Sequence, residues 1–354
     1  MRAFFFIGKN YLKYVLILLV GLEFFFVSAD SMKYADHFPD SANLVILFFV
    51  YDAMYALNYT LPLSLVLGGI LFYITFLKSA QFSAMLALGY SKRKIIAPVL
   101  FISLLMTIGY IGLNATPFVY AQEKAEAIVD QNALQNARED IFVKYNNDYV
   151  YFQKVYPLLN KAENIKVFEL DGEELKSFVD AKTAFFDGDY WILHDVNVVK
   201  IKDEFIKNQN FLETSHIARL KILKNFRPKV LDTFSKDKPT VSIVDAIVSA
   251  KILISQKIDF EKVRAILYSF IVIPFFVPLT LIIVAYFVPP LARYANIPLM
   301  SFGFVILSLI LWGIFFSVSK LSVSGIIYPE FGILIPMGIL TIFALYALVR
   351  INQA

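Results

Sequence analysis

One long polar segment divides this chain into two apolar blocks, and this arrangement constrains the fold more than any other feature. Residues 117–262 contain 21 of the 33 Lys and Arg residues and 23 of the 29 Asp and Glu residues. The polar segment is therefore slightly acidic, and the formal net charge of +4 comes from the apolar blocks. Basic residues that flank apolar sequence do not indicate a nucleic-acid-binding protein, which would carry a basic face on its soluble domain.

The two apolar blocks are long enough to cross a membrane several times. Hydrophobic residues make up 58% of the chain and charged residues 18%, whereas soluble domains have about 45–50% and about 25%. The mean hydropathy is +0.63. We therefore expect an integral membrane protein with six transmembrane helices in a 3+3 arrangement, at Tyr11–Ser28, Leu61–Leu77, Ile95–Asn114, Tyr268–Val288, Leu299–Val318 and Phe331–Leu348.

The distribution of basic residues predicts the orientation of these spans. Arg2, Lys9 and Lys13 precede the first span, and basic flanks face the cytoplasm. Both termini are then cytoplasmic, and the polar segment, after an odd number of crossings, lies outside. A cleavable signal peptide is the alternative for the first span, because the basic start and the small residues Val27–Ala29 also fit that pattern.

The pattern within the polar segment changes from helix to strand and back to helix. A polar helix is expected over 121–137, followed by short strands with alternating aromatic residues and turns rich in Asp, Asn and Gly. This favours an antiparallel sandwich or β-jelly roll of about 110 residues. Ser242 and Asp245 form a capping box before an amphipathic helix. The expected domains are 1–116, 117–262 and 263–354.

The sequence contains no recognisable catalytic or nucleotide-binding motif. There is no Cys, which excludes disulfides and thiolate metal sites, and the three His residues are widely separated. No phosphate-binding GxxxxGK[ST] loop and no GxSxG motif occurs. We expect no metal, no cofactor and no enzymatic activity, so any uphill transport must use a partner or an ion gradient.

Ionisable residues near the end of the first span form a candidate binding site. Glu23, Asp30, Lys33 and His37 are spaced so that a helix would place them along one stripe. An ionisable group in the hydrocarbon costs about 2.5–3.5 kcal/mol by insertion scales, so it normally faces a partner or a wet cavity. Two interpretations remain: an Asp30–Lys33 pair at the outer interface, or a Lys33 that faces a cavity and an anionic ligand.

The connection between the second and third spans is a candidate docking element. A short amphipathic helix over 79–88, a C-capping Gly89 and the basic run Lys92–Lys94 follow one another. An ordinary basic loop is the simple interpretation. A helix that sits in a groove of a partner is the functional one. The run from Ala87 to Ile95 resembles the A-x-G-x-S-x-x-x-[IV] pattern in the coupling loops of ATP-binding-cassette permeases.

Three further motifs, in order along the chain, make it resemble the LptF/LptG permeases, which export lipopolysaccharide from the inner membrane of Gram-negative bacteria. Met32–Asp36 resembles the family's [IM]-K-[FY]-x-[DE] segment, Tyr190–Leu193 its W-x-L strand, and Gly325–Pro329 with Pro336 its G-x-x-x-P segment. The similarity covers essentially the whole length. The Lys33-to-Asp36 segment is more like LptG than LptF.

The resemblance implies a role as a membrane subunit of a transporter. Its partners would be an LptB-like cytoplasmic ATPase homodimer that binds the ATP, a second LptF-like permease, LptC- and LptA-like periplasmic bridge proteins, lipopolysaccharide and membrane lipid. Lys33, with Asp30 and His37, would meet the substrate. The ATPase-coupling residues would be Gln81, Leu88, Gly89, Ser91, Lys92 and Arg93. Gln81 stands where the family usually has Glu, so the coupling contact here lacks that charge.

Two other functions fit part of the pattern. Cassette permeases of the lipoprotein-release or cell-division type have similar loops, but their soluble domain follows the first span, whereas here it follows the third. A non-transporting, membrane-anchored periplasmic binding module would use the polar segment alone and would not depend on an ATPase.

Overall fold

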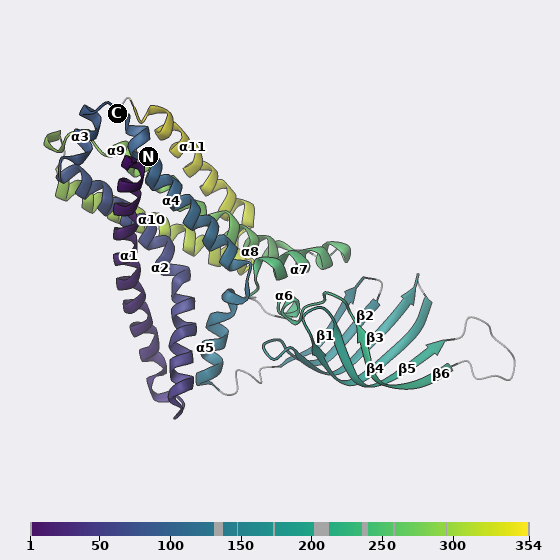
Figure 1. Cartoon of the computed structure of the whole chain (residues 1–354). Helices are drawn as coiled ribbons and strands as arrows, with labels where there is room; N and C mark the ends of the chain where they lie inside the picture. The colour runs from purple at the N-terminus through teal and green to yellow at the C-terminus, as the bar shows by residue number, and fades with distance from the viewer. Residues whose placement is uncertain are drawn as a thin grey trace. The chain divides into compact units, whose positions relative to one another are not determined.

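The computed structural model describes residues 2–130, 137–146, 148–172, 174–201, 212–235, 240–257, 259–294 and 296–352. The chain forms two compact units (Figure 1). The helical unit comprises Met1–Ala125 and Arg264–Ala354, and the central unit comprises Glu126–Val263. The divisions at 125/126 and 263/264 lie nine residues and one residue after the boundaries that the sequence suggested, 116/117 and 262/263.

The helical unit contains six helical segments, among the described residues, that are long and apolar enough to cross a membrane. This confirms the predicted 3+3 arrangement. The helices are α1 (Arg2–Ser31), η1 (Met32–His37), α2 (Ala42–Lys78), α3 (Gln81–Ala87), α4 (Lys92–Asn114), η2 (Pro117–Tyr120), α5 (Ala121–Val129), α8 (Glu261–Ile271), η5 (Ile273–Phe275), α9 (Phe276–Phe287), η6 (Ala292–Tyr294), α10 (Ile297–Val323), the π-helix η7 (Glu330–Leu334) and α11 (Ile335–Arg350).

Two of the helices that differ in extent from the sequence expectation are α2 and α5. The helix α2 is continuous for 37 residues, although we expected the span to begin only at Leu61, after Asp52 and Asn58. The amide of Asn58 has partners within α2 and on α4: it donates to the Tyr55 carbonyl (3.1 Å) and accepts from the Tyr110 hydroxyl (3.2 Å). The polar helix expected over 121–137 ends at Val129, and residues 131–136 lie outside the described ones.

Two adjacent glycines allow α2 to pack closely on its neighbours. A Cβ atom at Gly68 would lie 3.0 Å from the backbone of Val15 in α1, and one at Gly69 would lie 2.3 Å from the side chain of Leu281 in α9. The Tyr11 hydroxyl of α1 donates to the Leu65 carbonyl of α2 (3.1 Å). The Gly68-Gly69 pair therefore serves helix packing, as small residues do between membrane helices.

The central unit contains one six-stranded antiparallel sheet with the order β1-β2-β3-β4-β5-β6. This confirms the inserted β domain. The strand order, which the sequence left open, is a meander in which neighbouring strands are consecutive in the chain. The strands are β1 (Arg138–Tyr145), β2 (Asp148–Tyr156), β3 (Lys161–Asp171), β4 (Glu174–Phe186), β5 (Trp191–Ile201) and β6 (Leu212–Ile222).

The alternation of buried and exposed residues is interrupted at one place in each of the strands β2 to β5, and these places lie side by side across the sheet. Buried positions on β2 to β5 are separated there by three residues instead of two: Phe152 and Val155, Ile165 and Ala162, Ala181 and Ala184, Leu193 and Val196. At this level Asp140, Asn164 and Asp195 have positive φ angles of 53°, 51° and 56°. Such irregularities bend strands and increase their twist, so this line lets both halves of the sheet keep an apolar inner face.

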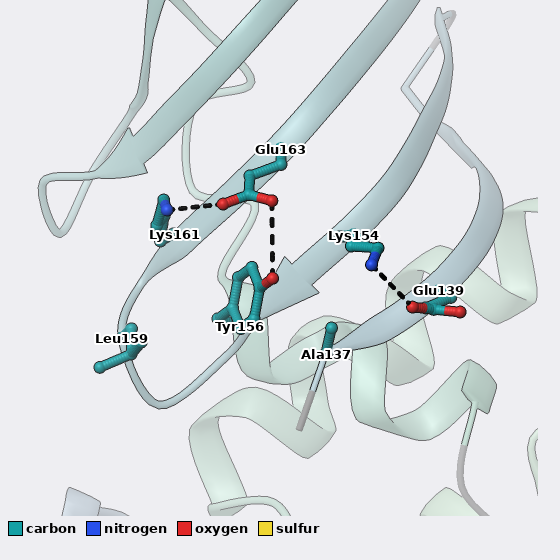
Figure 2. A pocket seen from close by; sticks show the side chains of 7 residues that line it. All are labelled: Ala137, Glu139, Lys154, Tyr156, Leu159, Lys161 and Glu163. Atoms are coloured by element: carbon teal, nitrogen blue, oxygen red, sulfur yellow. Dashed lines mark hydrogen bonds and ion pairs between the residues drawn. The ribbon is translucent and has the colours of Figure 1, made fainter. Parts of the chain in front are cut away.

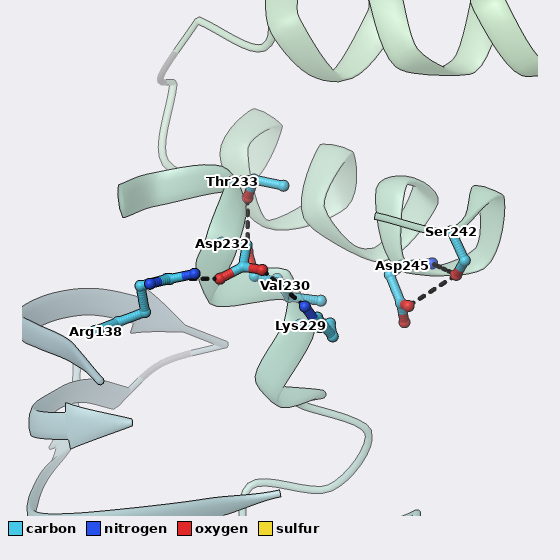
Figure 3. Close-up of polar contacts among 7 residues, drawn as sticks. All are labelled: Arg138, Lys229, Val230, Asp232, Thr233, Ser242 and Asp245. Carbon is cyan, nitrogen blue, oxygen red and sulfur yellow. Dashed lines mark hydrogen bonds and ion pairs between the residues drawn. The ribbon is translucent and has the colours of Figure 1, made fainter. Parts of the chain in front are cut away.

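Helical segments cover the inner face of the sheet and are fixed by buried charges (Figure 3). They are η4 (Pro228–Leu231), α6 (Asp232–Ser235) and α7 (Ile243–Ser255). The buried Asp232 carboxylate accepts from Arg138 of β1 (3.0 Å) and from Lys229 (3.1 Å). The N-cap of the predicted capping box is confirmed, because the Asp245 amide donates to Ser242 Oγ (3.1 Å); the Ser242 hydroxyl in turn donates to the Asp245 carboxylate (2.7 Å).

Candidate functional site

The end of α1 carries an exposed ammonium group. Lys33 lies on η1, directly after α1, and its ammonium forms an ion pair with Asp30. The Lys33 side chain is 68% exposed, whereas Asp30 is largely covered. An ammonium has three N–H donors, and the pair with Asp30 is its only ion pair among the described residues. The structure thus contains the predicted Asp30–Lys33 pair and leaves the cation accessible.

The predicted stripe of four ionisable residues does not continue along one helix. The α-helix ends at Ser31, and Lys33 and His37 lie on the tighter turns of η1. The change from 3.6 to 3.0 residues per turn rotates these side chains away from the stripe that a continuous α-helix would form with Glu23 and Asp30. Of the three predicted substrate-binding residues, Asp30 and Lys33 are in contact, and His37 is exposed on η1.

A buried carboxylate on α2 completes the cluster around Lys33. Asp52 is 2% exposed and lies within electrostatic reach of Asp30, Lys33 and Glu23. Its Oδ2 atom has no hydrogen-bond partner among the described residues. Glu23 accepts a hydrogen bond from Thr60 of α2 (2.5 Å). Asp52 was not among the predicted site residues, although an acid inside an apolar span is itself a signal for a functional site.

Apolar and aromatic side chains extend along α1 below this charged cluster. Phe24, Phe25 and Met32 are strongly exposed. Phe26 stacks on Tyr59 of α2, with ring centroids 5.4 Å apart, and the Tyr59 hydroxyl is 2.9 Å from that of Tyr55. An exposed cation above an apolar helix face is suited to an amphiphile with an anionic head and hydrocarbon tails.

The second predicted site, the α2–α3–α4 connection, has one exposed face. The amides of Gly89 and Tyr90 donate to the carbonyls of Leu86 (3.0 Å) and Met85 (3.1 Å). With Gly89 at φ +84°, these two bonds form a Schellman motif, which confirms the predicted C-cap. Phe82 anchors the inner side of α3 in the core, while the outer face carries Gln81, Ala84 and the 76% exposed Leu88.

The basic residues that follow α3 turn back toward the helix bundle. Ser91 is the N-cap of α4. Lys92 is only 4% exposed, and its ammonium donates to the carbonyls of Tyr286 (3.0 Å) and Val288 (2.7 Å). The Arg93 guanidinium donates to the carbonyls of Leu348 (3.1 Å) and Val349 (2.6 Å). Of the predicted coupling residues, Gln81, Leu88, Gly89 and Arg93 are exposed, and only Arg93 among these four uses its side-chain donors on a neighbouring helix.

A surface hollow of about 610 Å³ opens on the outer face of the central sheet (Figure 2). Its charged side chains pair with one another: Lys154 with Glu139 (3.2 Å) and Lys161 with Glu163 (2.6 Å). The hydrogen bond that Lys154 donates to Glu139 raises the pKa of Lys154, and the one that Lys161 donates to Glu163 raises the pKa of Lys161. Because the charges compensate each other within the sheet, the hollow has no excess charge for a ligand.

Among the residues that the structure describes, no group of three or more His, Cys, Asp or Glu residues could hold a metal ion. The acids Asp30, Asp52 and Glu23 form one cluster with the Lys33 ammonium. The arrangement can hold an anionic group through Lys33 and present an apolar face beside it.

Together, the fold and these sites define a class: a multi-pass helical membrane protein with a β domain inserted between its third and fourth spans. The family model of the lipopolysaccharide export system permease LptF/LptG matches residues 6–350, nearly the whole chain. The protein belongs to this family of inner-membrane permeases, which confirms the resemblance found in the sequence. The family model covers both LptF and LptG. A comparison with curated proteins finds no match.

Proposed function

We propose that this chain is the permease subunit of an ATP-binding-cassette transporter that extracts lipopolysaccharide from the inner membrane and passes it to a periplasmic bridge. The observation that carries the proposal is the exposed Lys33 ammonium above the apolar face of α1, in a chain of a lipopolysaccharide export family. Lipopolysaccharide combines phosphate groups with acyl chains, and an ammonium forms strong charge-assisted hydrogen bonds with phosphate oxygens.

The acids around Lys33 adjust how tightly it holds a phosphate. Asp30 pairs with the ammonium, and Asp52 and Glu23 lie near it. Asp30 positions Lys33 at the surface of the site, while the surplus of carboxylates keeps the cluster from retaining an anion too strongly. A transporter needs this balance, because the substrate must enter the site and also leave it.

The proposed ATPase partner binds the exposed face of α3. The permease itself hydrolyses no ATP and takes no cofactor in this proposal; an LptB-like cytoplasmic ATPase homodimer supplies the energy. Leu88 and Gln81 present an apolar contact and a neutral hydrogen-bonding group to it. The N-terminal end of α1 and the C-terminal end of α11 lie at the same end of the bundle as α3 (Figure 1), which supports cytoplasmic termini and a periplasmic central unit.

The remaining partners complete an export machine. A second, LptF-like permease would share the transport path, and LptC- and LptA-like proteins would receive lipopolysaccharide from the central β unit. We assign the chain to the LptG type because of the segment Lys33-Tyr34-Ala35-Asp36.

Substitution of Lys33 tests this proposal. In cells that depend on this chain, Lys33→Ala should cause lipopolysaccharide to accumulate in the inner membrane while the complex with the ATPase still assembles. Lys33→Arg should retain part of the export because it keeps the charge. Lys13→Ala, which changes an exposed lysine in the N-terminal half of α1, is the matched control and should export normally. Normal export by Lys33→Ala would refute the role of this lysine.

A further inference from the structure

The end of α9 lacks the usual means of satisfying its last carbonyl groups. The final turn of a helix leaves carbonyls without amide partners, and following residues often cap them. Here Val288 is extended, with ψ 118°, and the next two residues are Pro289 and Pro290, which have no N–H group. The Lys92 ammonium fills this role through its bonds to the carbonyls of Tyr286 and Val288. A cation at this position also suits the negative end of the helix dipole.

The end of α11 is held in a similar way by the next residue of α4. Arg93 donates through Nε and Nη2 to the carbonyls of Leu348 and Val349, and its own amide donates to Asn352 Oδ1 (3.2 Å). Consecutive residues of a helix point about 100° apart, given 3.6 residues per turn. Two adjacent basic residues at the start of α4 can therefore reach two different helix ends.

The short helix α3 is tied directly to the same region. Its Ser83 hydroxyl donates to the Pro290 carbonyl (2.8 Å), just after α9. On its inner side, Phe82 is buried and packs edge-to-face on Phe76 of α2, with centroids 6.2 Å apart. The connection that carries the exposed docking face is thus fastened to the ends of α2, α9 and α11, although these helices are far apart in the sequence.

We propose that Lys92 and Arg93 are positioning residues that transmit a displacement of α3 to the ends of α9 and α11, so that three helices respond to one docking event. The inference rests on the proposed function, in which α3 receives the ATPase. Charge-assisted hydrogen bonds join side chains of α4 to backbone carbonyls of α9 and α11, so α3 and α4 cannot shift alone without breaking them.

The test is a reconstituted transport assay with the complete complex in proteoliposomes, with ATP hydrolysis and lipopolysaccharide release measured together. Lys92→Gln and Arg93→Gln should still assemble with the ATPase and hydrolyse ATP, but release less lipopolysaccharide per ATP. A loss of about fivefold or more is expected, since coupling between sites commonly spans roughly 5–150-fold. Arg93→Lys should restore part of the yield. Lys94→Gln, an exposed basic neighbour, is the matched control and should behave as the unmodified chain.

A distance measurement provides a readout that a purely structural role would not change. Because the chain has no Cys, single labels can be placed at Ala84 in α3 and Tyr346 in α11, both exposed. Electron paramagnetic resonance should show a distance between the two labels that stays constant through the ATP cycle when Arg93 is present. In Arg93→Gln this distance should vary with nucleotide.

The outcomes separate the two proposals. If the unmodified complex shows no ATP-dependent release, the proposed function itself fails. If it transports normally and Lys92→Gln and Arg93→Gln also keep the full yield per ATP, the transmission role is refuted alone. Loss of complex assembly in both variants would likewise refute it, because the residues would then serve only to hold the fold.

Discussion

Lys33 and Lys92 lie toward opposite ends of the helix α2, and the structure uses the two cations in different ways. Lys33 is largely exposed and pairs with one carboxylate, whereas Lys92 is buried and donates to two helix-end carbonyls. An α-helix of 37 residues is about 55 Å long at 1.5 Å per residue. The same residue type thus has two roles in the first membrane block. Lys33 provides an accessible charge, and Lys92 holds the end of α9 through hydrogen bonds.

The largest effect is expected on ATPase binding, from a change of Gly89 near the Lys92 end of α2. Its φ of +84° is closed to proline, whose ring fixes φ near −65°. Gly89→Pro should therefore destroy the Schellman motif, displace Leu88 and abolish co-purification of the ATPase. Gly89→Asn is the control, because asparagine tolerates the left-handed region, and it should retain most of the partner. Equal recovery of the ATPase with both variants would refute the docking assignment.

Removal of a buried charge that has fixed partners should lower the free energy of unfolding. The Asp232 cluster of the central unit provides the test. Asp232→Asn keeps the shape but leaves Arg138 and Lys229 without their carboxylate. Breaking such a buried pair costs about 3–5 kcal/mol. The measurement is urea unfolding followed by Trp191 fluorescence in a Trp312→Phe background, since these are the only two Trp residues. Asp189→Asn, on an exposed turn, is the control. Identical midpoints for both variants would contradict the assigned role.

The smallest change in stability is expected at the exposed pair near Lys33. Asp30→Asn removes a partner of an exposed ammonium, and such pairs contribute about 0–1 kcal/mol. The same change frees the cation and lowers the negative charge around it, so binding of lipopolysaccharide should become stronger, by roughly two- to fivefold. Binding to the purified complex in nanodiscs would measure this. Weaker binding would mean that Asp30 contacts the substrate or that Lys33 needs it in order to point correctly.

The sequence predicted those features that depend on local pattern. The six spans follow from long apolar runs, the capping box of Ser242 and Asp245 from their spacing, and the C-cap at Gly89 from the end of an amphipathic helix. Each of these signals lies within one short stretch of chain, so it can be recognised in the sequence without knowledge of the tertiary contacts.

Features that depend on contacts between distant segments could not be predicted in this way. The direction of Lys92 is set by α9, nearly two hundred residues later, whose last carbonyls need a donor because two prolines follow the helix. The irregular level of the sheet involves single residues such as Asn164 and Asp195, and it is recognisable only when the strands are aligned. Asp52 is an intermediate case, because its position in an apolar run was visible but its neighbours Asp30 and Lys33 were not.

The central claim is that the Lys33 end of the chain meets lipopolysaccharide and the α3 end meets a protein. Two exposed side chains give a matched pair for photo-crosslinking in cells, Met32 beside Lys33, at 78% exposure, and Leu88 at the end of α3, at 76%. With a photoreactive amino acid at each position, residue 32 should capture lipopolysaccharide, and residue 88 should capture a cytoplasmic ATPase. Absence of lipopolysaccharide from the residue-32 adducts, or equal amounts of it at both positions, would contradict the account.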